Sequence, residues 1–224
     1  MPATGKTADS ATGCVLLIGL TGTYCAGKNH VAAMLASRGL PVLDVDKLGH
    51  ACLENQKAAV FERFGDDTKN PDGSVNRKAL GAKVFGNKAE IAALEAIVHP
   101  EANRMTTDWV EAQGGKTCVV NAALLHKSVV FGRLDCILLV QAPWLVRLVR
   151  AVRRDRLPLA VLLRRFASQK QFVSQYLAGN ADIYRVENPG IGKPVLSRNP
   201  DRRKTRLEYR LEQRIDKILA ELKP

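Results

Sequence analysis

The feature that most constrains the fold is a glycine-rich loop between a short apolar run and a helical one. The apolar run is CVLLIGL at 14–20, and residues 22–28 then follow the phosphate-loop spacing G-x-x-x-x-G-K. The next run, NHVAAMLASRG, has apolar residues at helical spacing and stops at Gly39. This order predicts a buried parallel strand, a phosphate-binding turn and a helix, which together begin an α/β protein.

Backbone amides at a helix N-terminus, with a nearby lysine, hold phosphate groups. Three other Gly-Lys stretches, TGKT at 4–7, GGKT at 114–117 and GIGK at 190–193, lack the preceding strand and the full spacing. The alternative for 22–28 is a strand–helix turn that needs glycine only for its conformation. We interpret the stretch as a nucleotide site, whose predicted cofactor-binding residues are Gly22, Thr23, Tyr24, Cys25, Ala26, Gly27, Lys28 and Asn29.

Asn29 stands where this motif normally has a Ser or Thr hydroxyl that binds Mg²⁺. The amide oxygen of Asn is also a neutral hard ligand, on a longer arm, and it can bind directly or through water. We therefore expect Asn29 to be a weak metal ligand, with metal fixation reduced and not lost.

The rest of the chain alternates between strand-like and helical segments. A second β-branched run spans 40–46, and two further apolar runs at 116–125 and 134–143 predict more strands, with a last one in ADIYRVENPG. Residues 47–115 read as an insertion of helices that covers one side of the site. Asn76 is predicted to cap one of them, and Pro100 to end another by displacing His99 from helical geometry.

Two helices separated at Pro158 are predicted to follow the fourth strand. A final amphipathic helix carries one apolar face that is expected to dock on the sheet: Leu207, Leu211, Ile215, Ile218 and Leu222. Residues 1–12 are interpreted as a disordered tail, and residues 13–224 as one domain.

Composition limits the partners and the compartment. The 224 residues carry 34 Lys and Arg against 22 Asp and Glu, a net charge of +12 that favours an anionic partner. Five scattered cysteines without C-x-x-C spacing indicate reduced, buried thiols and no zinc site. No apolar run is long enough to span a membrane, so we expect a cytoplasmic protein without a membrane partner.

Six motifs in order resemble the dephospho-CoA kinases, which phosphorylate the ribose 3′-hydroxyl of dephospho-coenzyme A. GLTGTYCAGK is similar to the family's G-L-T-G-x-x-x-[SA]-G-K, VLDVD to V-[IL]-D-A-D, and LEAIVHP to L-x-x-I-x-H-P. PDGSVNRKALGAKVF is similar to D-G-x-[IL]-[ND]-R-x-x-L-x-x-x-V-F, and RAVRRD to the R-x-x-x-R-D of the lid helix. Gln169, NAD at 180–182 and Asn188 match the last signals, with one extra residue before Asn188.

The resemblance implies a fold and a set of roles. The fold is a P-loop NTPase-like parallel sheet flanked by helices, with a core at 13–46, 116–146 and 176–224. A helical acceptor-binding insertion spans about 47–115, and a basic helical lid about 147–175. ATP and Mg²⁺ are the implied cofactors, and dephospho-CoA the acceptor. The implied catalytic residues are Asp46, Lys28 and Arg150. Arg154 and Asn188 join the ATP site, and the implied acceptor-side residues are Thr21, Asp44, Arg77 and His99.

Two of these roles compete with simpler ones. Asp46 is expected at the end of the second strand, on one face with Asp44. There it would act as the base for the ribose hydroxyl or as an anchor of metal-bound water. The alternative is that Asp46 is only a helix N-cap. Arg150 and Arg154 share a helix face. Residues 147–170 hold eight Lys or Arg against Asp155 alone, which favours a lid over ATP more than an ordinary solvated face.

One segment departs from the family pattern. The family's D-x-P-L-L-[FY]-E is replaced here by NAALLHK, so that Asn121, Ala123 and Lys127 stand for Asp, Pro and Glu. These changes bear on metal-water positioning and on the acceptor pocket. They keep two alternatives open: another nucleoside or nucleotide kinase, or a catalytically weakened nucleotide binder with a basic nucleic-acid surface. Aromatic residues make up only 5% of the chain, which disfavours nucleic acid as a partner. Oligomeric state has no signal in the sequence.

Overall fold

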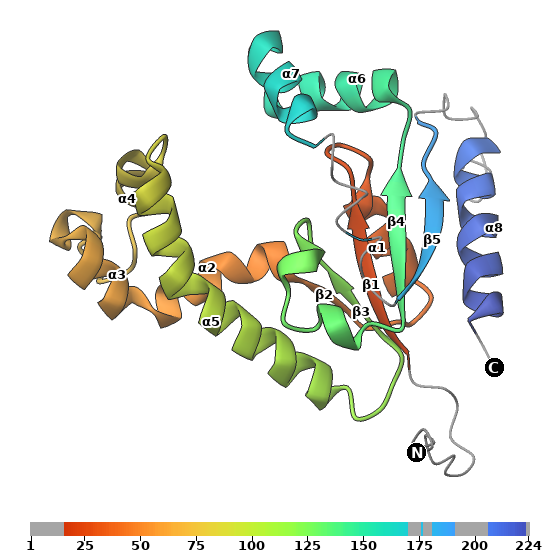
Figure 1. The fold of residues 1–224 in the computed structure, drawn as a ribbon, viewed down its shortest axis with the longest axis horizontal. Coiled ribbons are helices and arrows are strands. Elements are labelled where there is room, and N and C mark those ends of the chain that lie inside the picture. The colour runs from red at the N-terminus through yellow and green to blue at the C-terminus, as the bar shows by residue number, and fades with distance from the viewer. Residues whose placement is uncertain (1–15, 170–175, 177–180, 191–205, 223–224) are drawn as a thin grey trace, which may run out of the picture.

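The computed structural model describes residues 16–169, 176, 181–190 and 206–222. Within them one sheet of five parallel strands has the order β2-β3-β1-β4-β5 (Figure 1). The strands are β1 Leu17–Gly22, β2 Val42–Asp44, β3 Cys118–Asn121, β4 Cys136–Gln141 and β5 Asp182–Glu187. Four of them lie inside runs that the sequence predicts to be extended, and β1 begins in the run at 14–20 and ends two residues beyond it. The expected parallel α/β sheet is confirmed.

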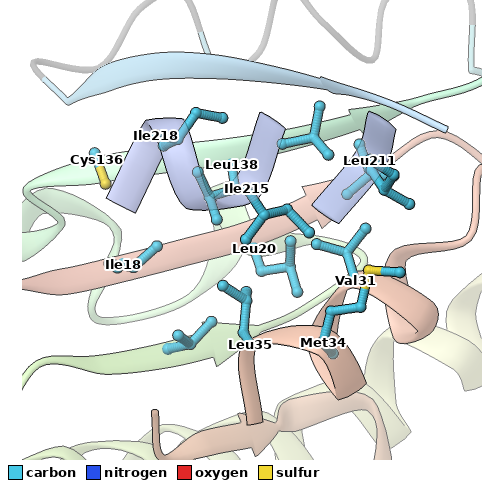
Figure 2. Close-up of a cluster of buried hydrophobic side chains, with 14 of the residues drawn as sticks. Ile18, Leu20, Val31, Met34, Leu35, Cys136, Leu138, Leu211, Ile215 and Ile218 are labelled. Atoms are coloured by element: carbon cyan, nitrogen blue, oxygen red, sulfur yellow. The ribbon is translucent and has the colours of Figure 1, made fainter. Parts of the chain in front are cut away.

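The central strand β1 is buried along its whole length, between β3 and β4. Its alternate side chains Ile18 and Leu20 point to the face covered by α1, Lys28–Ala36, and α8, Arg206–Glu221. Figure 2 shows side chains of both helices, including Leu35 and Ile215, meeting those of β1 and β4. The docking predicted for the last helix is confirmed, because Leu211, Ile215 and Ile218 are fully buried there.

The other face of the sheet carries Leu17, Ile137 and Leu139, which pack with Leu125 of the short helix η2, Leu125–Lys127, and with Tyr176. Gly19 makes this packing possible, because a Cβ at that position would lie 2.6 Å from Leu125 Cδ2. A second short helix, η3, spans Phe131–Arg133. With apolar side chains buried on both faces, the strands read in sequence as continuous apolar runs.

A block of helices projects from one edge of the sheet (Figure 1). It contains α2 Val45–Asn55, α3 Lys57–Phe64, η1 Asp66–Thr68, α4 Arg77–Val84 and α5 Lys88–Ala112. The block has its own core, in which Val60, Phe64, Val75 and Leu80 are buried. Asn76 caps α4 by accepting a hydrogen bond from Ala79 N at 3.1 Å, as predicted.

The expectation that Pro100 ends a helix is wrong. α5 runs without interruption from Lys88 to Ala112 with Pro100 inside it, and His99 is helical. A proline removes one backbone donor from a helix, at a cost of about 3 kcal/mol. The side chain immediately after Pro100 supplies a tertiary contact: Glu101 accepts a hydrogen bond from Asn55 of α2, and a second one from Arg104 within α5.

These contacts lead to a pH-dependent prediction. Hydrogen bonds from Arg104 and Asn55 lower the pKa of Glu101 from 4.5 to about 2. A carboxylate with a lowered folded-state pKa stabilises the fold above its ordinary pKa, and that contribution is lost as the pH falls toward 2. Glu101→Gln should therefore lower the melting temperature at pH 7, with the difference from wild type shrinking between pH 4.5 and 2. Glu111→Gln, an exposed site on the same helix, is the control; an equal effect from it would contradict the assignment.

Two helices follow β4 and lie beyond the carboxyl end of the sheet (Figure 1). They are α6 Trp144–Asp155 and α7 Leu159–Ala167, and Pro158 separates them as predicted. The predicted tail at 1–12 and residues 170–175 of the predicted lid lie outside the described residues. Among the described helices, none is long and apolar enough to cross a membrane.

Candidate active site

The glycine loop joins β1 to α1 at the point where the strand order reverses in the sheet. β1 pairs with β3 on one side and with β4 on the other, and ligands bind at the carboxyl end of parallel strands at such a switch point. Two glycines are required by this geometry. A Cβ on Gly22 would lie 2.8 Å from Val140 O, and Gly27 has φ 95° with Asn188 Nδ2 only 2.3 Å from where its Cβ would be.

The loop carbonyl oxygens are held from the side of α6 and β5. Arg147 Nε donates to Tyr24 O at 2.8 Å, and Arg150 and Asn188 both donate to Ala26 O, at 2.9 and 2.8 Å. In a planar trans peptide the C=O and N–H groups point in opposite directions. The amides of Cys25 and Gly27 therefore point away from the arginines. In the first turn of α1 the His30 amide donates to Gly27 O at 3.0 Å, whereas the amides of Lys28 and Asn29 lie too close to the helix N-terminus for an acceptor within the helix. This arrangement suits an anion.

Lys28 and Asp46 form an ion pair of 2.6 Å between Nζ and Oδ2. The other carboxylate oxygen of Asp46 accepts a hydrogen bond from Ala123 N at 3.1 Å, after β3. The predicted strand position of Asp46 is wrong. β2 ends at Asp44, which occupies the N-cap position of α2, and Asp46 lies in the first helical turn. The strand is short because its register with β3 ends at the pair Asp44 and Asn121.

Polar oxygens without a partner gather at the ends of β2 and β3. Asp44 Oδ1 and Asn121 Oδ1 are buried and accept no hydrogen bond from a described residue. Asn121 Nδ2 donates to Asn29 Oδ1 at 3.4 Å, so that the two asparagines that replace a hydroxyl and a carboxylate face each other. Hard cations prefer such oxygen ligands. The described residues contain no cluster of three or more His, Cys, Asp or Glu side chains, so a cation here would depend on the Asp44 carboxylate together with amide oxygens and its phosphate ligands.

Tyr24 connects the loop to the two helices above it. Its hydroxyl donates to Asp155, its ring lies 5.2 Å from the guanidinium of Arg154, and it meets Phe166 edge-on. Hydrogen bonds from Arg154 and from Tyr24 lower the pKa of Asp155 to about 2. Asp155 is the one acidic residue in the basic segment 147–170, and it forms ion pairs with both Arg154 and Arg165. The predicted face shared by Arg150 and Arg154 lies toward the loop.

The side chain of Gln169 is hydrogen-bonded to one of the backbone amides of the loop. Its Oε1 accepts a hydrogen bond from Tyr24 N at 2.6 Å, as a phosphate oxygen would. The sequence marked Gln169 as a motif position without a role. Because nucleotide must displace this contact, we expect Gln169→Ala to tighten ATP binding about threefold, a typical value of one net hydrogen bond. Isothermal titration calorimetry would measure this, with Ser168→Ala as the neighbouring control. Weaker binding by Gln169→Ala would mean that Gln169 contacts the nucleotide.

Thr21 and Tyr176 form a buried polar group behind Asp46. Thr21 Oγ1 lies 3.3 Å from Tyr176 OH, and both hydroxyls donate to Ala123 O at 3.4 Å. His126 Nδ1 also lies 3.3 Å from Tyr176 OH. These hydrogen bonds position Ala123, whose backbone amide donates to Asp46. No sequence signal pointed to Tyr176, because a single aromatic residue outside a motif is normally core.

A cavity of about 340 Å³ opens beside the loop. It is lined by Thr23, Gln141, Ala142, Pro143, Arg147, Glu187 and Pro189. The Thr23 hydroxyl oxygen is buried and has no hydrogen-bond partner among the described residues. Burial lowers the pKa of the Arg147 guanidinium, which nonetheless remains charged because its ordinary pKa is above 12. The cavity has a mixed polar and apolar lining and begins at Thr23 of the loop.

Two predicted acceptor-side residues lie in the helical block. Arg77 begins α4, which Figure 1 places at the far end of the block from β1, and His99 lies within α5. Both side chains are exposed, and neither forms a hydrogen bond with another described residue. The contacts among the described residues connect Thr21, Lys28, Asn29, Asp44, Asp46, Arg150 and Asn188 with the loop or the ends of β2 and β3. Arg77 and His99 take part in none of these contacts.

Comparison with known proteins agrees with this geometry. The sequence profile of the dephospho-CoA kinase family matches residues 16–183, which is most of the chain. The chain is 39% identical to the dephospho-CoA kinase of Anaeromyxobacter dehalogenans over 188 residues, covering 81% of this chain and 88% of the relative. It is 33% identical to that of Treponema pallidum, covering 78% and 87%. A crystal structure from Thermus thermophilus, 31% identical, superposes with a TM-score of 0.70 over 93% of this chain and 98% of that one.

Proposed function

Because the chain belongs to the dephospho-CoA kinase family, we propose that it transfers the γ-phosphoryl group of ATP to the ribose 3′-hydroxyl of dephospho-CoA. The products are ADP and coenzyme A. The observation that carries the proposal is the 2.6 Å pair between Lys28 Nζ and Asp46 Oδ2. It sets a phosphate-binding lysine beside a carboxylate able to accept a proton, at the ligand-binding edge of the sheet.

The loop and the cavity beside it form the proposed ATP site. The amides of Cys25, Gly27 and the first turn of α1 hold the phosphates, and Lys28 leaves Asp46 to neutralise them. The adenosine end lies in the 340 Å³ cavity next to Thr23 and Arg147. Support comes from Arg150 and Asn188, whose bonds to Ala26 O hold the loop in this conformation before the nucleotide arrives.

In the proposed reaction, the ribose 3′-oxygen attacks the γ-phosphorus of ATP, and Asp46 accepts the proton of that hydroxyl. The bond between that phosphorus and the bridging oxygen breaks, and the electron pair leaves with ADP. Arg150 and Arg154 lie above the loop, where their charge stabilises the transferring group. The acceptor-side roles of Thr21, Asp44, Arg77 and His99 stay predictions; those of Arg77 and His99 require the helical block to close toward β1.

The oxygens at the ends of β2 and β3 fit a hard cation. Asp44 Oδ1 and Asn121 Oδ1 are buried without a partner, and the Asn29 oxygen lies beside Asn121. We propose that these residues hold Mg²⁺, directly or through water. When bound with ATP, Mg²⁺ neutralises charge on the phosphate oxygens. The cytoplasmic location expected from the sequence also stays a prediction.

Asn29→Ser should strengthen this cation site. A hydroxyl on the first turn of α1 reaches the metal with better geometry than an amide, so the Mg²⁺ concentration for half-maximal activity should fall several-fold. Asn29→Ser/Asn121→Asp, which also restores a carboxylate, should lower it further. Asn29→Ala is the matched control and should raise it. An unchanged Mg²⁺ dependence in all three variants would exclude Asn29 from the cation site.

A single assay tests the function. Purified protein is incubated with ATP and Mg²⁺, and ADP release is measured with dephospho-CoA, adenosine or a nucleoside monophosphate as acceptor. We expect turnover that depends on dephospho-CoA. Faster turnover with a monophosphate would assign the site to a nucleotide kinase, and tight ATP binding without turnover on any acceptor would identify a nucleotide-binding protein. Mass and NMR spectroscopy should identify the product as coenzyme A, with the new phosphate on the ribose 3′-oxygen.

A further inference from the structure

The helix pair α6–α7 exposes an unusual amount of apolar surface. Twelve large apolar side chains are exposed among the described residues, and seven of them lie in these two helices. The seven are Trp144, Leu145, Val149, Val152, Leu159, Val161 and Leu163. Three of them, Leu145, Val149 and Val152, share one side of α6, and we call these three the outer face. Exposed apolar patches on soluble proteins often mark binding sites.

α6 is amphipathic in the reverse of the usual sense. A surface helix normally turns its apolar stripe toward the core. Here Arg147 and Arg150 point to the loop carbonyls, and Arg154 stacks on Tyr24. Leu145, Val149 and Val152 follow the spacing i, i+4, i+7 and are 67%, 44% and 47% exposed. The outer face is therefore opposite the nucleotide loop, and a partner bound there leaves the loop contacts in place.

The charge around the outer face identifies the partner's chemistry. Arg153, Arg156 and Arg164 are exposed on the same helix pair and form no ion pair with a described residue. Asp155, the acid between them in sequence, is held by Arg154 and Arg165. A second copy of the chain packed symmetrically on this face would bring like charges together. An anionic surface would neutralise them.

We propose that the outer face docks on an anionic membrane surface. Leu145, Val149 and Val152 would enter the boundary between headgroups and acyl chains, with the exposed arginines on the lipid phosphates. This contact is peripheral and departs from the expectation, drawn from the sequence, that the protein has no membrane partner. It does not depend on the proposed kinase activity, because none of these side chains belongs to the candidate active site.

Vesicle co-sedimentation of the full chain tests the proposal. Vesicles with about 30% phosphatidylglycerol in phosphatidylcholine are compared with pure phosphatidylcholine, and binding to the anionic vesicles should be about tenfold stronger and fall with added salt. Leu145→Ser/Val149→Ser should reduce binding about tenfold. Arg153→Glu/Arg164→Glu should do the same, while turnover of soluble substrates by Leu145→Ser/Val149→Ser changes less than about twofold.

Two matched controls separate docking from general attraction of a basic protein. Phe85→Ser removes an apolar side chain that is 88% exposed on the helical block, and Lys78→Glu/Lys88→Glu makes the same change in charge far from the outer face. Both should bind vesicles like wild type. The proposal is overturned if wild type ignores anionic vesicles, or if the lysine variant loses as much binding as the arginine variant. It is also overturned if light scattering finds a dimer that Leu145→Ser/Val149→Ser dissociates.

Discussion

Asp46→Asn should lower kcat about 10³-fold, within the range that a general base contributes. An amide keeps the shape of the side chain but cannot take the proton of the ribose hydroxyl. ATP binding should survive and become tighter, because Lys28 loses the carboxylate that it contacts at 2.6 Å and is free for the phosphates. We expect a much lower kcat with retained affinity for ATP. Steady-state kinetics would measure kcat, and calorimetric titration would measure ATP binding.

The matched control for this variant is Asp67→Asn in the helical block. Asp67 forms an ion pair with Lys83 that is also 2.6 Å long and partly exposed, but lies on η1, in the helical block beyond the sheet. Its loss should leave kcat within about twofold, because an exposed pair stabilises a protein by 1 kcal/mol or less. If Asp46→Asn loses ATP affinity in the same proportion as turnover, Asp46 supports the loop structurally and is not the base.

Arg150→Ala should also lower kcat by roughly 10³-fold, the lower end of the range for an arginine that stabilises a transferring phosphoryl group. Arg150 also donates to Ala26 O and Asn188 Oδ1. Its removal therefore loosens the loop, and the KM for ATP should rise as well. Arg150→Lys keeps the charge but not the paired donors, so it should recover only part of the loss.

Arg153→Ala serves as the control for Arg150. It lies in the same helix, is exposed, and has no contact with the loop. Its kinetic constants with soluble substrates should match those of wild type. Retention of more than about a third of kcat by Arg150→Ala would remove Arg150 from the catalytic group and leave only its contact with the loop.

Sequence reasoning predicted all five strands, of which β1, β3 and β4 are buried apolar runs and β5 is a largely exposed edge strand. It predicted the loop because its motif needs local glycines and a following helix. It failed at Pro100 and at Asp46. In both cases local propensity was overridden by tertiary contacts. α5 continues through Pro100 while Glu101 contacts α2 through Asn55, and β2 ends early where its pairing with β3 stops. Strand and helix boundaries depend on neighbours that a local pattern does not contain.

The site was predictable where a residue's role follows from its own motif, as for Lys28, Gly27 and Arg150. Contacts between segments far apart in the chain were not. Gln169 bonds to Tyr24 N across 145 residues, and Tyr176 lies beside Thr21 across 155. No spacing rule connects such pairs, because their approach depends on how the sheet and the helices after β4 are stacked.

By itself the sequence determined the order of strand, loop and helix, the parallel sheet and the basic character of the helix after β4, since these follow from local periodicity and composition. The tertiary structure decided which face of that helix meets the loop. An apolar stripe normally turns inward, yet α6 turns its arginines inward. The physical reason is that the buried carbonyl oxygens of the loop need donors, and Arg147 and Arg150 are placed to satisfy them.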